Sequence, residues 1–352
     1  MGSVYLKRIS LLIAFILILT STTLIGCNKS IKYTKTYIEY FDTVSSVVGY
    51  ESNEETFIKN TEKIEALLEQ YHKLFDIYNS YTGINNIYTI NQNAGIKPIT
   101  VDKKIIEFID YAKDIYNMTN GKTDITFGSV LKIWHNYRVD GIANPDIAKL
   151  PEPSKLAAGA IHRGFDNIII DREKNTVYIS DKDMSLDVGA VAKGYATEQI
   201  AQYLEENGIK GYALNIGGNL RVVGDKPDGS MWTAGITNPI SNDENSILMR
   251  VMLKRNSFVT SGSYLRFYTV DNIRYHHIID TETLYPKNEF LSVSVSCDDS
   301  GLADSLSTAL FNMDIDSGMS LINSLENTEA LWVTASGQII YSKSFENMII
   351  RE

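Results

Sequence analysis

Three short stretches carry the residue types that could handle a phosphate-bearing substrate. The first, Leu186 to Tyr195, packs the carboxylate of Asp187, two glycines and the cation Lys193 into a turn between a strand-like and a helix-like segment. Backbone N–H groups at the start of a helix favour phosphate, and a lysine one turn into the helix adds a mobile positive charge. The stretch predicts an anion-binding turn. Its alternative is ordinary strand-to-helix punctuation without a ligand.

The second stretch, Gly301 to Leu310, carries Asp304 and Thr308 four residues apart. That spacing puts both side chains on one face if the segment is helical. A carboxylate and a hydroxyl are hard oxygen ligands, which suit Mg²⁺ better than zinc. The alternative interpretation is that Asp304 only caps a helix.

The third stretch holds two adjacent histidines, His276 and His277, in a strand-like context. Neighbouring residues of a strand point to opposite faces, so at most one of the two should reach a given site. No Cys/His set with zinc-site spacing accompanies them. A general base and an ordinary strand histidine therefore both remain open here.

The remaining pattern predicts the elements that position these stretches. Helical spacing predicts helices over 64–75, 105–116, 190–206 and 302–324, and two runs at 167–170 and 176–179 predict a hairpin. Further strands are expected at 213–223, 231–236, 247–253, 257–270, 290–297, 329–334 and 338–342. Strands outnumber helices without regular alternation, so we expect an α+β fold of mixed, largely antiparallel sheets with flanking helices.

The N-terminus predicts export. Lys7 and Arg8 precede an apolar run from Ile9 to Leu19, which is signal-peptide length and too short to span a bilayer. The ending Leu24-Ile25-Gly26-Cys27 resembles the lipobox of bacterial lipoproteins. We therefore expect a signal peptide over 1–26, lipidation of Cys27, a spacer over 27–36 and a folded domain over 37–345. The protein would be extracytoplasmic and lipid-anchored to the plasma membrane; the alternative is an uncleaved signal anchor.

The net charge bears on the kind of partner, and the cysteine content bears on disulfide formation. The formal net charge is −10, and removal of Lys7 and Arg8 with the leader would make it −12. An acidic chain argues against nucleic acid as a partner. The two cysteines are Cys27 and Cys297. If Cys27 is lipidated no intrachain disulfide can form, and Cys297 lies in an apolar alternation that favours a buried thiol over a reactive one.

The ordered motifs resemble the ApbE family of flavin transferases over roughly residues 37–345. The matching segments are Phe41-Asp42-Thr43, Asn120 to Asp124, Leu186 to Tyr195, Asn215 to Gly218, Thr260 to Gly262, His277 to Asp280 and Ala303 to Thr308. The resemblance implies a single ApbE-like domain. It also implies an enzyme that cleaves FAD, transfers FMN to a threonine hydroxyl of a target redox protein and releases AMP.

The resemblance also assigns roles to residues. It implies that Asp304, Thr308 and the backbone carbonyl of Ala190 ligate Mg²⁺, and that His277 is the base that activates the acceptor. FAD contacts are implied for Asp187, Lys193, Asp124, Thr123, Phe41 and Ile278 or Ile279. The alternatives are hydrolysis of FAD to FMN and AMP, or a lipoprotein that binds flavin without chemistry.

This chain departs from the commonest family pattern at three places. Relatives often read Asp-Pro-x-Thr-Gly-x-Pro after the histidine, where this chain has Asp280 to Pro286 with Thr281 and Leu284 in place of the proline and glycine. Phe41-Asp42 replaces Met-Gly, and Lys122-Thr123 replaces a small-aromatic pair. These changes bear on flavin packing and acceptor choice more than on phosphate chemistry.

Overall fold

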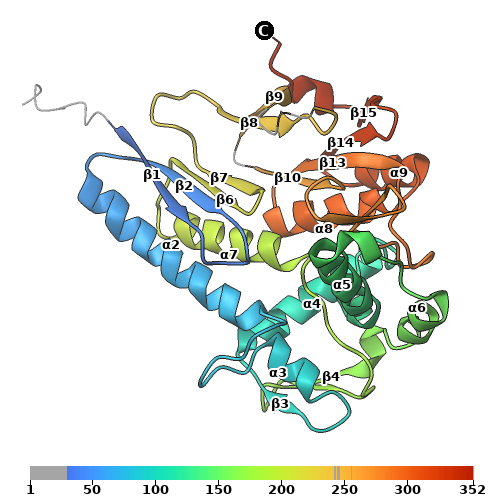
Figure 1. The fold of residues 1–352 in the computed structure, drawn as a ribbon. Helices are drawn as coiled ribbons and strands as arrows, with labels where there is room; N and C mark the ends of the chain where they lie inside the picture. The colour runs from blue at the N-terminus through green and yellow to red at the C-terminus, as the bar shows by residue number, and fades with distance from the viewer. Residues whose placement is uncertain (1–29, 242, 244–245, 255, 352) are drawn as a thin grey trace, which may run out of the picture.

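The computed structural model describes residues 30–241, 243, 246–254 and 256–351. Its centre is an eight-stranded sheet in which every neighbouring pair is antiparallel (Figure 1). In spatial order the strands are β1 (Ile31–Tyr37), β2 (Ser45–Glu51), β6 (Tyr212–Ile216), β7 (Asn219–Val223), β10 (Ser257–Gly262), β13 (Phe290–Cys297), β14 (Glu329–Thr334) and β15 (Ile339–Tyr341). The predicted α+β class is confirmed.

Strand alternation decides what covers each face of this sheet. Leu214 and Ile216 of β6 pack with α2 (Glu54–Phe75) and α7 (Ala192–Glu206). Ala213, which precedes Leu214, packs on the opposite face against the hairpin of β8 (Trp232–Thr237) and β9 (Ile247–Leu253). Helices α8 (Ser300–Phe311) and α9 (Ile315–Ser324) cover the β10–β13–β14 end on the helical face. The sheet is therefore apolar on both faces, and it is a rigid support for α7 and α8.

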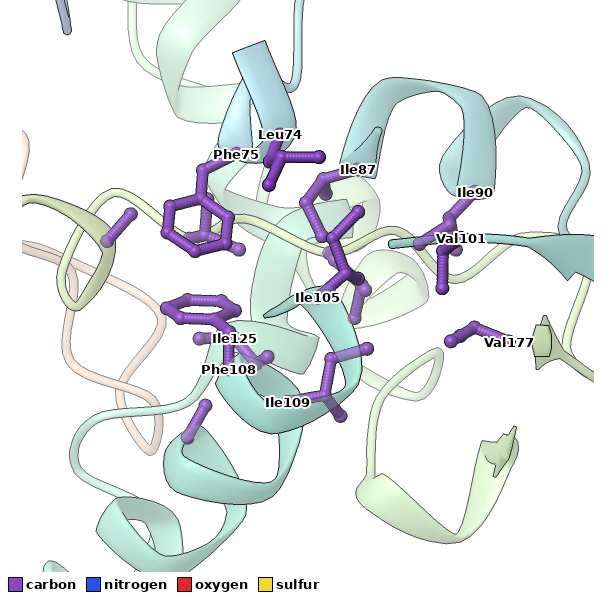
Figure 2. Close-up of a cluster of buried hydrophobic side chains, with 14 of the residues drawn as sticks. Leu74, Phe75, Ile87, Ile90, Val101, Ile105, Phe108, Ile109, Ile125 and Val177 are labelled. Atoms are coloured by element: carbon purple, nitrogen blue, oxygen red, sulfur yellow. The ribbon is translucent and has the colours of Figure 1, made fainter. Parts of the chain in front are cut away.

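A second core lies beyond the helical face (Figure 2). The end of α2 packs there with α3 (Ile87–Gln92), α4 (Lys103–Met118) and a small sheet of β3 (Ile99–Thr100), β5 (Thr176–Ile179) and β4 (Ile168–Asp171). Phe75 and Phe108 stack with ring centroids 4.4 Å apart. This core fixes the loop that enters α7, because Leu186, Val188 and Val191 belong to the same cluster.

The remaining elements close the side where the two cores meet. They are the 3₁₀ turn η1 (Ile125–Phe127), α5 (Gly128–Ala143), η2 (Pro145–Ile147), α6 (Pro153–Ala160), η3 (Phe165–Asn167), the hairpin of β11 (Phe267–Val270) and β12 (Ile273–His276), and η4 (Phe345–Met348). Trp134 of α5 packs against Tyr268 and Tyr275 of that hairpin. This packing holds α5 beside the segment that carries the two histidines.

The structure corrects several expected boundaries. The run 257–270 is two strands broken by a turn at 263–266, and 302–324 is two helices separated at Asn312, whose backbone ends α8. Residues 31–36, expected as spacer, form most of β1, which pairs with β2 along its whole length. The expectation of a spacer is therefore wrong from Ile31 onward. At the other end, the Ile350 N–H donates to the Arg250 carbonyl, so ordered contacts continue past residue 345.

Two further expectations concern the cysteines and the membrane. Cys297 is buried at 2% exposure, and burial raises the pKa of its thiol to about 12, as expected of an inert core cysteine. The predicted signal peptide and Cys27 lie outside the described residues. Within the described part of the chain, no helix has the length and apolar character needed to cross a bilayer.

Candidate active site

A cavity of about 490 Å³ opens between α5, α7, α8 and the end of β12. Its walls bring together residues that the sequence separates by more than 250 positions. The ten folded residues singled out from the sequence all line it: Phe41, Thr123, Asp124, Asp187, Ala190, Lys193, His277, Ile278, Asp304 and Thr308. The eleventh, Cys27, lies outside the described residues.

One wall of the cavity is built by the close approach of α7 to α8. The Gly194 N–H donates to Asp304 Oδ2 at 2.9 Å, and Lys193 Nζ lies 3.3 Å from the same oxygen. Gly194 must be glycine for this contact, because a Cβ there would lie 2.4 Å from both Asp304 Cβ and the Ser300 carbonyl oxygen. The predicted anion-binding turn and the predicted metal-ligand helix thus meet directly.

Asp304 is a buried carboxylate that needs positive charge beside it. Only 4% of the residue is exposed, and burial raises its pKa, while Lys193 and the Gly194 N–H oppose the rise. Asp304 does not cap α8, because Asp299 is the N-cap and its side chain accepts from the Leu302 N–H. The capping alternative is therefore wrong, and Asp304 sits inside the helix with its side chain directed at α7.

The donor set around Asp304 fits a hard divalent cation. Thr308 follows one turn later on α8, and Ala190 lies in the loop that precedes α7. Lys193 Nζ lies 3.4 Å from the Gly189 carbonyl oxygen, so the ammonium bridges that loop to Asp304. Among the described residues no hydrogen bond reaches Asp304 Oδ1, which leaves this oxygen for a metal ion. Carboxylate, hydroxyl and carbonyl oxygens are the ligands that Mg²⁺ prefers.

Asp187 and Asp124 line the cavity from neighbouring turns. Asp187 Oδ1 accepts from the Gly189 N–H at 3.0 Å, and its own N–H donates to the Ile125 carbonyl. Asp124 begins η1 by accepting from the N–H and hydroxyl of Thr126. Burial raises the pKa of both carboxyl groups. Asp124 therefore stabilises the start of η1, in addition to any contact with a ligand.

Thr123 and Phe41 are held in place by contacts of their own. Thr123 donates its hydroxyl to the Ser305 carbonyl at 2.8 Å and is 2% exposed, so its side chain ties the 119–124 loop to α8. Phe41 has a φ of 55°, in the left-handed region, and its N–H donates to His72 Nδ1. The Phe41 and His72 rings meet edge to face. Phe41 thus forms one wall of the cavity on a strained turn.

The two histidines have different surroundings, although only His276 belongs to β12 and His277 follows its last residue. His276 is buried against Phe311, and its ring bonds the Lys287 carbonyl and the Ile278 N–H. His277 lines the cavity. Its Nδ1 is shielded from solvent and has no hydrogen-bond partner among the described residues, so Nε2 is the nitrogen that a substrate can reach. Burial, followed by the charges of Arg266 and Arg138, lowers the pKa of His277 to about 3. The imidazole is therefore neutral at physiological pH, and in the empty cavity it is a weak base.

Sequence reasoning missed a group of basic residues that also line the cavity. His135 and Arg138 come from α5 and Arg266 from the turn between β10 and β11, and all three line the cavity. We predicted no helix over 128–143, because its apolar side chains do not form one clean stripe: one side of α5 faces this polar cavity. The signal that could have found them is local, since His135 and Arg138 are one turn apart.

The structure explains two of the departures from the family pattern. Lys122 Nζ lies 3.1 Å from Asp280 and 3.0 Å from Glu282, so the unusual lysine is paired with two carboxylates across the cavity edge. Leu284 has a φ of 65°, the conformation that favours glycine, and its carbonyl accepts from Trp134 Nε1. The turn therefore keeps its shape without the glycine, at a conformational cost of about 1 kcal/mol.

Comparison with known proteins identifies the family to which this chain belongs. The ApbE family model matches residues 36–332, and the chain belongs to the ApbE family. The FAD:protein FMN transferase of Klebsiella pneumoniae is 30% identical over 283 residues, covering 79% of this chain and 85% of that protein. The protein of the same name from Treponema pallidum is 27% identical over 289 residues, covering 77% and 78%.

Solved structures agree on the fold. The crystal structure of the ApbE protein from Thermotoga maritima superposes with a TM-score of 0.78 at 25% identity, covering 91% of this chain and all of that one. The flavin transferase ApbE of Vibrio cholerae gives a TM-score of 0.74 at 24% identity, covering 91% and 99%. A single ApbE-like domain, as the motifs predicted, is therefore confirmed.

Proposed function

We propose that this protein is an FAD:protein FMN transferase that moves FMN from FAD to a threonine hydroxyl of an acceptor protein and releases AMP. Membership in the ApbE family supports a flavin transferase. The observation that carries the proposal is the cavity, in which a neutral His277 shares one space with Lys193, Asp304 and Thr308. A base and a phosphate-neutralising group are the two things that this reaction requires.

His277 would act as the general base. The threonine oxygen attacks the phosphorus nearer riboflavin, its proton passes to His277 Nε2, and a new O–P bond forms as the P–O bond to AMP breaks. AMP leaves as an anion, and the imidazolium then returns its proton to solvent. A threonine hydroxyl is a poor nucleophile at neutral pH without such a base.

In the free protein His277 is a weak base, so this role requires its pKa to rise when substrate binds. Arg266 and Arg138 contribute to lowering it, after burial. When an anionic substrate enters the cavity, its negative charge offsets these cations and raises the pKa toward the working range. The base would therefore gain strength when substrate is bound.

The pyrophosphate of FAD would be bound by Lys193 and a metal ion. We propose that Asp304, Thr308 and the Ala190 carbonyl hold Mg²⁺, which when bound neutralises charge on the pyrophosphate. Lys193 would turn from Asp304 to a phosphate oxygen, while Asp187 and Asp124 contact the nucleotide. Phe41, Thr123 and Ile278 would shape the walls against which the rings pack.

The cellular setting is part of the proposal. Cleavage after Gly26 and lipidation of Cys27 would anchor the protein outside the plasma membrane. Its acceptor would then be a threonine-bearing subunit of a membrane or extracytoplasmic electron-transfer protein. Labelling cells with an alkyne fatty acid tests the anchor, since the Cys27→Ala variant should lose the label.

One assay tests the activity. Purified protein is incubated with FAD, Mg²⁺ and a threonine-bearing acceptor domain, and denaturation-resistant flavin fluorescence is measured on the acceptor. Labelling that disappears with His277→Ala and Asp304→Ala supports transfer. AMP release without labelling would indicate an FAD hydrolase instead, and bound but unchanged FAD would indicate a flavin-binding protein.

A further inference from the structure

Arg138 and Arg266 are two cations at the cavity mouth whose charge no carboxylate balances directly. Among the described residues neither guanidinium forms an ion pair, whereas Lys122 and Lys193 each do. Arg138 bonds His135 Nδ1 at 3.3 Å. Burial and the charge of Arg266 lower the pKa of Arg138, so the two positive groups lie close enough to repel each other. Such an arrangement favours an anion between them.

The nucleotide does not account for this charge. Under the proposed function, the pyrophosphate of FAD brings two negative charges. Lys193 and a divalent cation, less the charge of Asp304, supply two positive charges to match them. Asp187 is a carboxylate whose charge interacts with both arginines, and even when it is counted one positive charge remains. The arginine pair therefore keeps one unbalanced positive charge, which one further carboxylate would neutralise.

The position of the pair faces the incoming acceptor. The His277 N–H donates to the Arg266 carbonyl at 3.0 Å, so Arg266 adjoins the proposed base. Arg266 is exposed, and Leu265 beside it is 69% exposed although it also lines the cavity. A macromolecule that brings a threonine to His277 must pass this rim.

We infer that His135, Arg138, Leu265 and Arg266 form a docking surface for the acceptor polypeptide, which places an acidic side chain between the two arginines and an apolar side chain on Leu265. This inference rests on the proposed function. The chain as a whole carries a net charge of −10. An acidic segment of the acceptor is therefore attracted to the positive rim and repelled by the rest of the acidic surface.

Matched peptides test the inference. The probes are synthetic threonine peptides of one length that carry a single Asp two, three or four residues to either side of the threonine, each with an Asn counterpart. For the wild-type protein we expect one Asp peptide to have a KM about tenfold below that of its Asn partner. In the double variant Arg138→Gln/Arg266→Gln this preference should vanish, with the loss falling on KM rather than kcat.

Two comparisons make the result specific. Arg138→Lys/Arg266→Lys should restore part of the preference for Asp, because charge remains while the planar fork is lost. Lys132→Glu, an exposed residue of the same helix that does not line the cavity, should behave as wild type. Equal losses for Asp and Asn peptides would overturn the inference. So would a tenfold weaker Kd for FAD with no change in peptide preference, since the pair would then bind nucleotide.

Direct binding separates this inference from the proposed function. Fluorescence anisotropy with the same peptides, labelled and with threonine replaced by alanine, reports docking without any transfer. A preference for Asp that depends on the arginines would support the docking surface even if no FMN transfer were detected. FMN transfer with no difference between Asp and Asn peptides in either assay would overturn the docking surface and leave the transferase intact.

Discussion

The two walls of the cavity are built in opposite ways. On the α7–α8 wall, Lys193, Gly194 and Asp304 are partnered and tightly packed, with Asp304 only 4% exposed. On the α5 wall, Arg138 and Arg266 have no ion-pair partner among the described residues, and Leu265 is 69% exposed. The closed wall fits a ligand of fixed chemistry, and the open wall fits a partner that arrives from outside.

The difference between the two walls also matches the distribution of the family motifs. The motifs at 186–195 and 303–308 build the closed wall, and one of the departures, Leu284, contacts Trp134 of α5. A metal–phosphate site tolerates little displacement, because its ligands must meet within a fraction of an ångström. A docking rim can change with its partner.

The closed wall should fail first when its charge is removed. Asp304→Asn keeps the size of the side chain and an oxygen for the Gly194 N–H but removes the negative charge that holds a cation. We expect AMP release to fall by about 100-fold or more, as measured by chromatography. Asp298→Asn, an exposed acid just before α8, is the control and should stay within about twofold. Full activity in Asp304→Asn would mean that this carboxylate holds no metal.

Packing of the same wall should be equally intolerant. Gly194→Ala puts a methyl group 2.4 Å from Asp304 Cβ and from backbone, so the helices must separate at a cost of about 1 to 3 kcal/mol. Urea unfolding measures this loss. Gly189→Ala is the matched control, because its Cβ would meet only Asp187 Oδ1 at 3.2 Å. If both variants unfold alike, the helix contact is looser than the structure indicates.

Lys193 should compete with the metal on the closed wall when no nucleotide is present. Its ammonium lies 3.3 Å from Asp304 Oδ2, so a second cation there meets repulsion until a phosphate draws the lysine away. Lys193→Met should bind Mn²⁺ without FAD about tenfold more tightly than wild type, and FAD itself more weakly. Titration followed by electron paramagnetic resonance measures free Mn²⁺. Lys182→Met, at a 79% exposed side chain, should change neither affinity.

The smallest expected effect is a pH dependence that involves both walls. The pKa of His277 falls from its ordinary value near 6.5 to about 3 on folding, so the unfolded chain binds the extra proton as pH drops. Its contribution to stability is present above pH 6.5 and is lost as pH falls toward 3. From pH 7 to 5.5 the wild type should lose about 1 kcal/mol more than His277→Gln.

Urea unfolding of both proteins at the two pH values measures this difference. His276→Gln provides a comparison inside the core, since burial lowers the pKa of His276 to about 4. Parallel losses in wild type and His277→Gln would show that His277 is not shielded from protonation by burial and by the arginines of the open wall.

Much of the fold followed from the sequence because periodicity reports burial. The strands at 290–297 and 329–334 and the helices at 64–75 and 105–116 were predicted from alternation or helical spacing, and all are present. The run 213–223 is also extended, but it forms two strands, β6 and β7, joined by a turn. β1 and α5 were missed for physical reasons. β1 is an edge strand whose residues are mostly exposed, and α5 divides its sides between a core and a polar cavity.

The sequence by itself determined the chemistry that this chain carries: an Asp–Lys turn, an Asp–Thr helix and a histidine pair, in an order that resembles one family. Only the tertiary structure decided that Lys193 and Gly194 meet Asp304. It also decided that His277 rather than His276 lines the cavity, and that Arg138 and Arg266 line the same cavity. The reason is that these contacts join helices and turns far apart in the chain. Local periodicity sets which side of each element is buried, while the packing of elements around two cores sets which sides meet.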